Sequence, residues 1–262
     1  MSTPDLRLER DSSLARLVID NPSRRNAISI AMWRRILDHC QTIEAAPDLL
    51  AVVLTGAGEN FCSGADIGEL AEAFATVETT REYNGLIQHA LAALATLNRP
   101  VIACVEGSCF GGGVSLALQC DRIIAAENAR FAITPAKIGL VYGHADTARL
   151  VQRIGGAAAK DLLFTGRTVD AATAKGLGLI DEIVGPGEAA RASERYAGSL
   201  RAQSQFSIRA EKRLINGLAA GPATPERFAA EAETAAAGPD FTEGRRAFLA
   251  RDAPKFPSLD PD

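Results

Sequence analysis

Three consecutive glycines, Gly111 to Gly113, stand directly before "VSLALQC", an apolar run that predicts a helix. Glycine destabilises a helix interior by roughly 1 kcal/mol relative to alanine, so the triplet points to another role. The first N–H groups of a helix lack intrahelical acceptors, and residues without side chains let a ligand approach them closely. The triplet therefore suits the binding of a negatively charged oxygen, although glycines also allow a helix to pack closely on a strand.

A second glycine-rich junction reads "LTGAGENFCSGADIGEL" and leads from a predicted buried strand through a loop into a helix. Its glycines are Gly56, Gly58, Gly64 and Gly68. Two junctions of this kind could each direct one backbone N–H at the same oxygen. Such a pair is what an oxyanion requires, because preorganised donors stabilise developing negative charge without reorganising.

The stretch "VYGHAD" places a phenol, an imidazole and a carboxylate within five residues, at Tyr142, His144 and Asp146. All three groups transfer protons in enzymes. Each also has a structural alternative. Tyr142 would line a wall, His144 would be an exposed loop residue, and Asp146 would cap the next helix with Thr147 beside it.

The surrounding pattern predicts an α/β fold. "LRLERDSSLARLVIDNP" alternates apolar and polar residues on both sides of Asp11, as a β-hairpin does, and a helix follows from an N-cap at Ser29. Three apolar runs, "LLAVVLTG", "RPVIACVEG" and "CDRIIAAEN", predict buried strands. Because helical segments separate them, we expect a sheet with crossover connections.

Beyond Ala145 the sequence is rich in alanine and predicts helices, interrupted by the short strand "LIDEIVG". Four of these helices follow that strand and extend through Leu249. Residues 217–226, "GLAAGPATPE", are the expected flexible joint, since glycine and proline punctuate an otherwise helical pattern.

Composition disfavours several classes of protein. The chain has 262 residues, of which 47% are hydrophobic, and a net charge of −4, which argues against nucleic acid as a partner. No apolar run nears the ~18 residues of a membrane helix, and the first residues lack the apolar region of a signal peptide, so we expect a cytoplasmic protein. The five cysteines are scattered without disulfide or metal-ligand spacing, which predicts small core residues.

Five segments resemble the crotonase, or enoyl-CoA hydratase/isomerase, superfamily and occur in the order found there. They are "NPSRRNAIS", "VVLTGAGENFCSGADIGEL", "GSCFGGGVSLALQCDRIIAAENARF", "AKIGLVY" and "AAAKDLLFTGRTVDAATAKGLGLIDEIV". The likeness covers nearly the whole chain, residues 5–256.

That resemblance implies a spiral of ββα repeats that assembles as a homotrimer or a dimer of trimers and binds an acyl-CoA thioester. It divides the chain into an acyl-CoA-binding core, residues 1–200, and a C-terminal helical trimerisation region, residues 201–262. The backbone N–H groups of Ala65 and Gly112 would hold the thioester oxygen. No metal and no cofactor beyond the CoA moiety of the substrate is implied, and no dinucleotide fingerprint follows the first strand.

Positions that contact CoA in the family also carry over. They are Arg25 and Ala27 near the nucleotide, Ser63, Asp66 and Ile67 along the adenine and pantetheine path, and Phe248 and Lys255 in the last helix and beyond. Structural alternatives are a solvated arginine or lysine, turn capping by Ser63 and Asp66, and core packing of Phe248.

Both glutamates with which hydratases of this family add water are missing from the matching positions. One would lie two residues after the glycine triplet, where this chain has Ser115. The other falls on Pro135, and a shift of one residue reaches Thr134 or Ala136. None of these side chains ionises, so simple hydration would lack its proton-transfer groups.

Reactions that pass through an enolate are favoured instead. Double-bond migration in a 3-enoyl-CoA would use Asp146 as a single acid and base, which requires a raised pKa. Decarboxylation of a malonyl-type CoA ester needs no base, and Tyr142 or His144 would protonate the product, although the family's decarboxylases carry a histidine at the position of Ala65. Further alternatives are thioester hydrolysis by Ser115, His144 and Asp146 as a triad, and a catalytically silent acyl-CoA binder.

We predict weak or absent hydration of crotonyl-CoA, because neither matching position carries a carboxylate. The measurement is the loss of enoyl-thioester absorbance with purified protein. Hydration with a kcat of about 10 s⁻¹, typical of enzymes, that survives both Tyr142→Phe and Asp146→Asn would contradict this interpretation.

Overall fold

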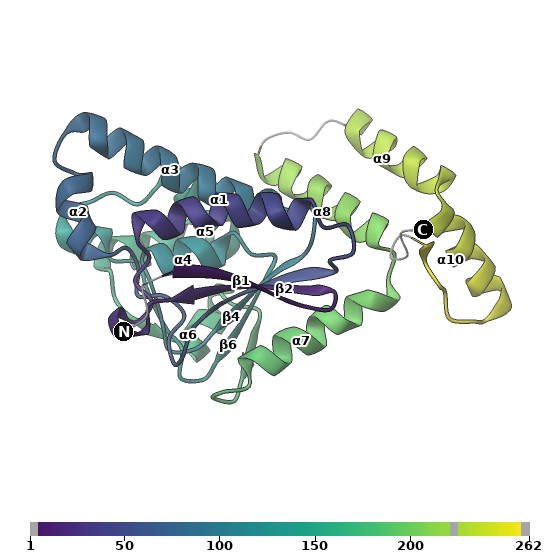
Figure 1. Cartoon of the computed structure of the whole chain (residues 1–262), viewed down its shortest axis with the longest axis horizontal. Helices are drawn as coiled ribbons and strands as arrows, with labels where there is room; N and C mark the ends of the chain where they lie inside the picture. Colours follow the sequence, from purple (N-terminus) through teal and green to yellow (C-terminus); the bar gives the residue numbers. More distant parts are fainter. Residues whose placement is uncertain (1–4, 221–224, 258–262) are drawn as a thin grey trace.

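The computed structural model describes residues 5–220 and 225–257. At its centre lies a six-stranded sheet in the order β1-β2-β3-β4-β6-β9 (Figure 1). The first pair is antiparallel and every later pair is parallel, which confirms the predicted hairpin and the crossover sheet. The strands are β1 (Asp5–Asp11), β2 (Leu14–Asp20), β3 (Ala51–Gly56), β4 (Val101–Val105), β6 (Arg122–Ala126) and β9 (Glu182–Val184).

A second sheet of three short strands has the order β5-β7-β8. Its strands are β5 (Ser108–Phe110), β7 (Arg130–Ala132) and β8 (Val169–Asp170). The chain repeatedly visits both sheets before it forms a helix: β4 and β5 precede α4 (Gly112–Leu118), and β6 and β7 precede α5 (His144–Thr165). This is the ββα repeat that the family resemblance implies.

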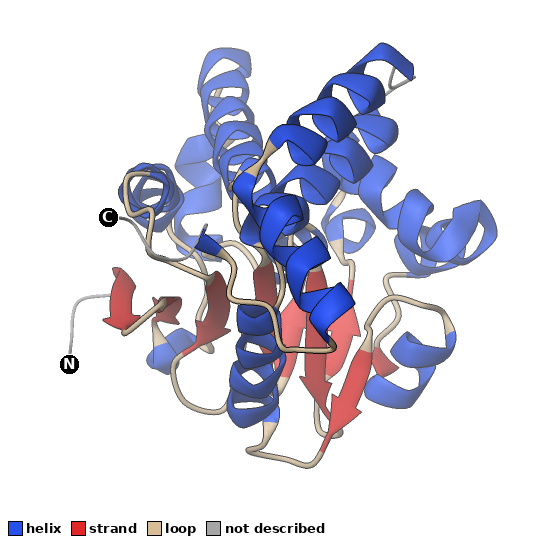
Figure 2. Ribbon diagram, turned by 90° about the vertical axis from the view of Figure 1, so that its right-hand side faces the viewer, coloured by secondary structure: helices blue, strands red, loops and turns tan. Residues whose placement is uncertain are grey.

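Alternate residues of the central strands face opposite sides of the sheet, and both sides are buried. Val52 and Leu54 join the larger core, whereas Ala51 and Val53 face a smaller cluster with residues of α7. Figure 1 accordingly shows α1 and α7 on opposite sides of the sheet, and Figure 2 shows the strands lying between helices. Burial on two faces explains the uninterrupted apolar runs.

Helix α1 begins where the sequence predicts it. The Ser29 side chain accepts a hydrogen bond from the Met32 N–H, and Met32, Trp33 and Ile36 face the core. The remaining elements of the core are η1 (Pro22–Arg24), α1 (Ile30–Glu44), α2 (Ile67–Ala73), α3 (Val77–Thr96), η2 (Pro135–Ile138), α6 (Ala171–Gly176), α7 (Ala189–Ser199) and η3 (Leu200–Ala202).

The five cysteines, Cys40, Cys62, Cys104, Cys109 and Cys120, are all buried free thiols, which confirms their prediction as core residues. Burial raises the pKa of each thiol, including that of Cys62 to about 12, so the thiols stay protonated and behave as small apolar groups.

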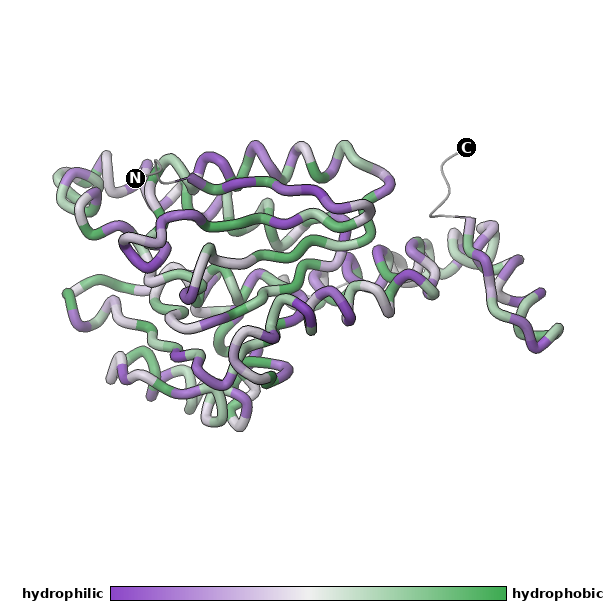
Figure 3. The backbone as a smooth tube through the Cα atoms, turned by 60° about the horizontal axis from the view of Figure 1, so that its bottom comes forward, coloured by the Kyte–Doolittle hydropathy of each residue, from purple (hydrophilic) through white to green (hydrophobic). Residues whose placement is uncertain are grey.

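Three helices form the C-terminal part: α8 (Gln205–Ala220), α9 (Pro225–Ala237) and α10 (Pro239–Ala250). The Lys212 ammonium anchors α8 by donating to the Arg99 carbonyl and the Asp121 carboxylate, both at 2.7 Å. Beyond α8, the chain projects away from the sheet as α9 and α10 (Figures 1 and 3). Of the predicted joint, residues 221–224 lie outside the described residues.

Both edges of the main sheet carry charged side chains. On β1, Arg7 pairs with Glu9 and Asp20, and Arg10 pairs with Asp48. On β9, Glu182 accepts a hydrogen bond from Arg122 at 2.8 Å. Within residues 5–220 and 225–257, no helix combines the length and the apolar content needed to cross a lipid bilayer.

We expect Gly113→Ala to destabilise the fold by about 2 kcal/mol through overpacking, because the new methyl group would lie 2.4 Å from the Cys62 carbonyl oxygen. Gly85→Ala in α3 is the matched control, since nothing lies within 4 Å of its methyl position. It should stabilise by roughly 0.5–1 kcal/mol through helix propensity. Urea denaturation measures both changes, and equal midpoints for the two variants would contradict this account.

Candidate active site

The two glycine-rich junctions of the sequence meet in the structure. A methyl group placed on Gly112 would lie 3.6 Å from the Ala65 nitrogen, and one placed on Gly64 would lie 3.6 Å from the Gly112 nitrogen. Gly64 has a φ of +105°, which a residue with a side chain rarely adopts. Residues 47 positions apart in sequence therefore bring their backbone nitrogens to one place.

Hydrogen bonds of the second sheet hold this approach. The Cys62 N–H donates to the Ser108 carbonyl at 2.9 Å, and the Phe110 N–H donates to the Cys62 carbonyl at 2.9 Å. Ala65 and Gly112 are both partly exposed, and among the described residues neither N–H donates to an acceptor. Two free donors beside each other at the start of α4 suit an oxygen that gains negative charge.

The glycine triplet serves close packing as well. Gly111 has a φ of +47°, and a side chain on Gly113 would collide with Cys62. Of the three glycines, only Gly112 lies beside the Ala65 N–H group. A methyl group placed on Gly112 would lie 3.6 Å from Trp33 Cζ2, which leaves room for it. The packing role and the ligand role considered for the triplet thus fall on different glycines.

A chain of hydroxyl groups begins at this helix start. The Ser115 hydroxyl donates to the Tyr142 hydroxyl at 2.8 Å, and the Tyr142 hydroxyl donates to the Gly111 carbonyl at 3.4 Å. Burial, followed by the negative charge of Asp146, raises the pKa of Tyr142 well above its ordinary value. The phenol therefore stays protonated near neutral pH and can act as a proton donor.

Asp146 lies at the end of this series of hydrogen-bonded hydroxyl groups, next to Ser115, and is only 3% exposed. The Gln119 amide donates to its Oδ1 at 3.5 Å. Burial raises the pKa of Asp146 to about 6, although hydrogen bonding with Ser115 and Gln88 and the charge of Arg149 oppose the increase. A carboxyl group with this pKa accepts and returns protons near neutral pH.

The structure decides among several sequence-based alternatives for these residues. Gly143, not Asp146, is the N-cap of α5, and no side chain caps this helix end, so capping does not explain Asp146. His144 begins α5 and is exposed, as the loop alternative predicted. The Ser115 hydroxyl bonds Tyr142 rather than His144, so the hydrolytic triad is not assembled.

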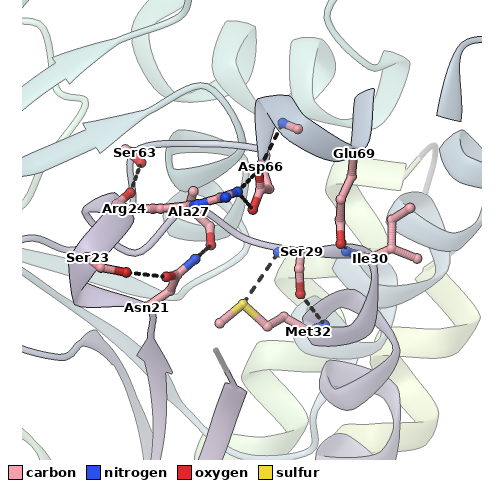
Figure 4. A network of polar contacts seen from close by, with 11 residues as sticks. Asn21, Ser23, Arg24, Ala27, Ser29, Ile30, Met32, Ser63, Asp66 and Glu69 are labelled. Carbon is pink, nitrogen blue, oxygen red and sulfur yellow. Dashed lines mark hydrogen bonds and ion pairs between the residues drawn. The ribbon is translucent and has the colours of Figure 1, made fainter. Parts of the chain in front are cut away.

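Five positions assigned to CoA by resemblance lie along two adjacent segments. The Ser63 N–H donates to the Arg25 carbonyl at 3.0 Å, and the Asp66 N–H donates to the Ile28 carbonyl at 3.0 Å. Figure 4 shows Ala27, Ser63 and Asp66 gathered near Arg24. Ala65 lies between Ser63 and Asp66 in the sequence and pairs with Ile28. These positions therefore lie on segments next to the Ala65 N–H, although Ala27 is only 7% exposed and Asp66 only 9%.

Local hydrogen bonds explain some of the residues at these positions. Asp66 caps α2 by accepting from the Gly68 N–H at 2.9 Å, as its alternative predicted, and it also accepts two bonds of 2.6 Å from the Arg24 guanidinium. Ser63 donates to the Arg24 carbonyl at 2.9 Å. Arg25 is exposed at a φ of +50°, and Ile67 is 80% exposed, so both are free to contact a ligand.

Phe248 and Lys255 lie elsewhere. Both belong to the part of the chain around α10, at the opposite end of the molecule from α2 (Figure 1). Phe248 is 84% exposed, so the alternative that it packs in the core is wrong, and Lys255 is exposed as expected. Neither residue reaches the site within one chain.

A family model described as enoyl-CoA hydratase/isomerase matches residues 9–258. The chain belongs to the enoyl-CoA hydratase/isomerase family. It is 31% identical over 262 residues to enoyl-CoA hydratase EchA19 of Mycobacterium tuberculosis, with 97% of each chain covered. It is 34% identical over 210 residues to short-chain-enoyl-CoA hydratase of Clostridium acetobutylicum, with 80% of each covered.

Solved structures agree with the assignment. A protein from Hyphomonas neptunium assigned to the enoyl-CoA hydratase/isomerase family is 43% identical and superposes with a TM-score of 0.92 over 96% of this chain and 97% of its own. An enoyl-CoA hydratase/carnithine racemase from Magnetospirillum magneticum is 30% identical, with a TM-score of 0.91 over 97% of this chain and 96% of its own. The crotonase fold predicted from the sequence is confirmed.

Sequence analysis of this family member missed Arg24, Gln88 and Gln119. Gln119 had a readable signal, because it is a polar residue at the end of an apolar helix and lies four positions after Ser115, on the same helix face. Arg24 and Gln88 had none. Each becomes notable only through its partner, and those partners lie 42 and 58 positions away, at Asp66 and Asp146.

The pKa of Asp146 predicts a pH-dependent stability. Because its folded pKa of about 6 exceeds the ordinary 3.8, folding favours the protonated form, and this stabilisation is lost as pH rises through the folded pKa. We expect Asp146→Asn to gain stability over the wild type by on the order of 2 kcal/mol between about pH 4 and pH 7. Urea denaturation at both pH values tests this, with exposed Asp161→Asn as the control. A pH-independent difference for Asp146→Asn would contradict it.

Proposed function

We propose that this family member binds an acyl-CoA thioester, stabilises its enolate and moves a carbon–carbon double bond. The supporting observation is one arrangement: a buried Asp146 joined through Ser115 and Tyr142 to the helix start that carries the free Gly112 N–H. The site thus combines oxyanion donors with one titratable carboxyl group.

The N–H groups of Ala65 and Gly112 would bind the thioester oxygen. An enolate carries its charge on that oxygen, so donors already in place stabilise it more than they stabilise the neutral thioester. The positive end of α4 adds to this effect. Loss of one such donor typically costs about 10²–10³ in kcat.

A single carboxyl group fits isomerisation of a 3-enoyl-CoA. Asp146, directly or through the Ser115 and Tyr142 hydroxyls, accepts the proton from C2, and the electron pair of that C–H bond forms a C1–C2 double bond while the carbonyl pair moves onto the thioester oxygen, which gives the enolate. When the carbonyl re-forms, the C1–C2 pair becomes the C2–C3 double bond and the old C3–C4 pair is released toward C4. The same proton then returns to C4. Acid and base are one group, so its pKa of about 6 serves both steps.

Decarboxylation remains the second candidate, favoured by Tyr142. Loss of CO2 from a malonyl-type CoA ester leaves its electron pair on the enolate, and the protonated phenol beside Gly111 would supply the proton. Exposed His144 is less suited to this role than Tyr142. A silent acyl-CoA binder is the alternative without turnover.

The CoA moiety is the only cofactor in this proposal. Arg25, Ser63 and Ile67, which are exposed or partly exposed beside Ala65, would contact it together with the largely buried Ala27, and the ion pair between Arg24 and Asp66 would hold these segments in place. Phe248 and Lys255 would contact CoA only from a neighbouring subunit.

Assembly as a homotrimer or a dimer of trimers is part of the proposal. The helices α9 and α10 project from the core and expose apolar side chains, among them Phe241, Phe248 and Leu249. A cavity of about 760 Å³ between α5 and α8 is also lined in part by apolar side chains, among them Leu118, Ile208 and Phe256. Burial of such surface between copies would stabilise an oligomer.

The decisive variants are Asp146→Asn and Tyr142→Phe, assayed with a panel of 3-enoyl-CoA, 2-enoyl-CoA and malonyl-type CoA esters by mass spectrometry and by isomer-resolving chromatography. For isomerisation we expect Asp146→Asn to lower kcat by about 10²–10⁴ and Tyr142→Phe by about tenfold to 10². CoA-ester binding should stay within a fewfold of the wild type.

Asp161→Asn, on the exposed side of the same helix, is the matched control and should leave kcat unchanged. Decarboxylation that depends on Tyr142 and not on Asp146 would favour the second candidate. Saturable binding without turnover across the panel would instead identify a silent binder and reject isomerisation.

A further inference from the structure

Gly143 leaves a gap between two polar side chains. A methyl group at this position would lie 2.6 Å from Asp146 Oδ2 and 2.8 Å from the amide nitrogen of Gln88. The backbone here has a φ of −59° and a ψ of 149°, which any residue adopts. The glycine is therefore explained by the space it leaves and not by its conformational freedom.

Amide groups from two other elements face the two carboxylate oxygens across this gap. Gln119, at the end of α4, donates to Oδ1 at 3.5 Å, and its nitrogen is fixed by a second bond of 3.1 Å to the Ser115 carbonyl. Gln88, on α3, faces Oδ2 and hydrogen-bonds the carboxyl group. The carboxylate is thus held from both sides.

Among the described residues, no cationic side chain forms an ion pair with the Asp146 carboxylate. Arg149 on α5 exerts a charge effect on Asp146 but forms no ion pair with it, and the other groups that face the carboxyl, Ser115 on α4 and Tyr142 in the preceding loop, are uncharged. A cation would hold the carboxylate ionised. A primary amide donates to the carboxylate without adding a charge, so it favours the charged form less strongly than a cation does.

We propose that Gln88 and Gln119 are positioning residues that hold the Asp146 carboxyl group toward the Ser115 and Tyr142 hydroxyls, with Gly143 providing the space for this contact. The proposal rests on the function proposed above for Asp146 in proton transfer. It assigns a role to three residues that do not themselves touch the substrate.

The test measures the titration of Asp146 directly, so it needs no turnover. The protein is labelled with ¹³C at the aspartate side-chain carboxyl carbon, and the Asp146 resonance is assigned by its loss in Asp146→Asn. We expect a pKa near 6 in the wild type and an increase of about one unit in Gln88→Met and in Gln119→Met, since each loses a donor to the charged form.

Gly143→Ala should also shift this titration, because its methyl group must displace the carboxylate or the Gln88 amide. Two matched controls should leave it unchanged: Gln41→Met on the exposed side of α1, and Gly156→Ala on α5, where nothing lies within 4 Å of the new methyl group. Gln88 is partly exposed, and its replacement by methionine leaves the buried contact between Gln119 and Asp146 intact. The Gln88 variant should therefore fold and keep the test valid.

Kinetics provide the second measurement. In the two glutamine variants we expect kcat to fall about tenfold with KM within twofold, and the acidic limb of the pH profile to move upward with the measured pKa. An unchanged Asp146 titration in both variants would overturn the positioning role, even if the enzyme isomerises its substrate. A shifted titration in a protein without turnover would support the role and reject the proposed function alone.

Discussion

The close approach between residues 62–65 and the first turn of α4 is the constraint on which the site depends. Two backbone segments can lie this near only where side chains are absent, which explains the glycines at positions 64 and 113. The short second sheet fixes the approach, because its hydrogen bonds join Cys62 to β5, and the Gly111 N–H donates to the carbonyl of Ala132, the last residue of β7, at 2.8 Å. Small changes in this packing would move both N–H groups.

The acid–base groups depend on the same helix. Ser115 and Gln119 lie one turn apart on α4, so the element that presents the Gly112 N–H also holds the hydroxyl and amide that contact Tyr142 and Asp146. Burying these polar groups is tolerated because each finds partners among the others. The Gly112 N–H and the buried group of Ser115, Tyr142 and Asp146 are therefore held by the same short helix.

The periodicity of apolar residues and the positions of the glycines were enough to predict most of the fold. The hairpin, the Ser29 cap and the buried strands followed from local patterns, because each depends on residues close in sequence. Ala65 and Gly112 were identified by the resemblance to the family's motifs, and the structure places their backbone nitrogens close together. The raised pKa of Asp146 could not be predicted from sequence, since it depends on burial beneath α3 and α4 and on partners such as Gln88. The cap prediction failed because the helix starts at His144, three residues earlier than a cap at Asp146 would require.

The charged outer strands of the main sheet have a consequence for how copies of the chain can meet. An edge strand offers unpaired N–H and C=O groups to any extended segment, and alternating charges along β1 oppose such an addition because an incoming strand would have to desolvate them. Sheet extension, the route to amyloid-like association, is thereby disfavoured. An oligomer of the kind proposed above would therefore assemble through helical surfaces rather than by extending the sheet.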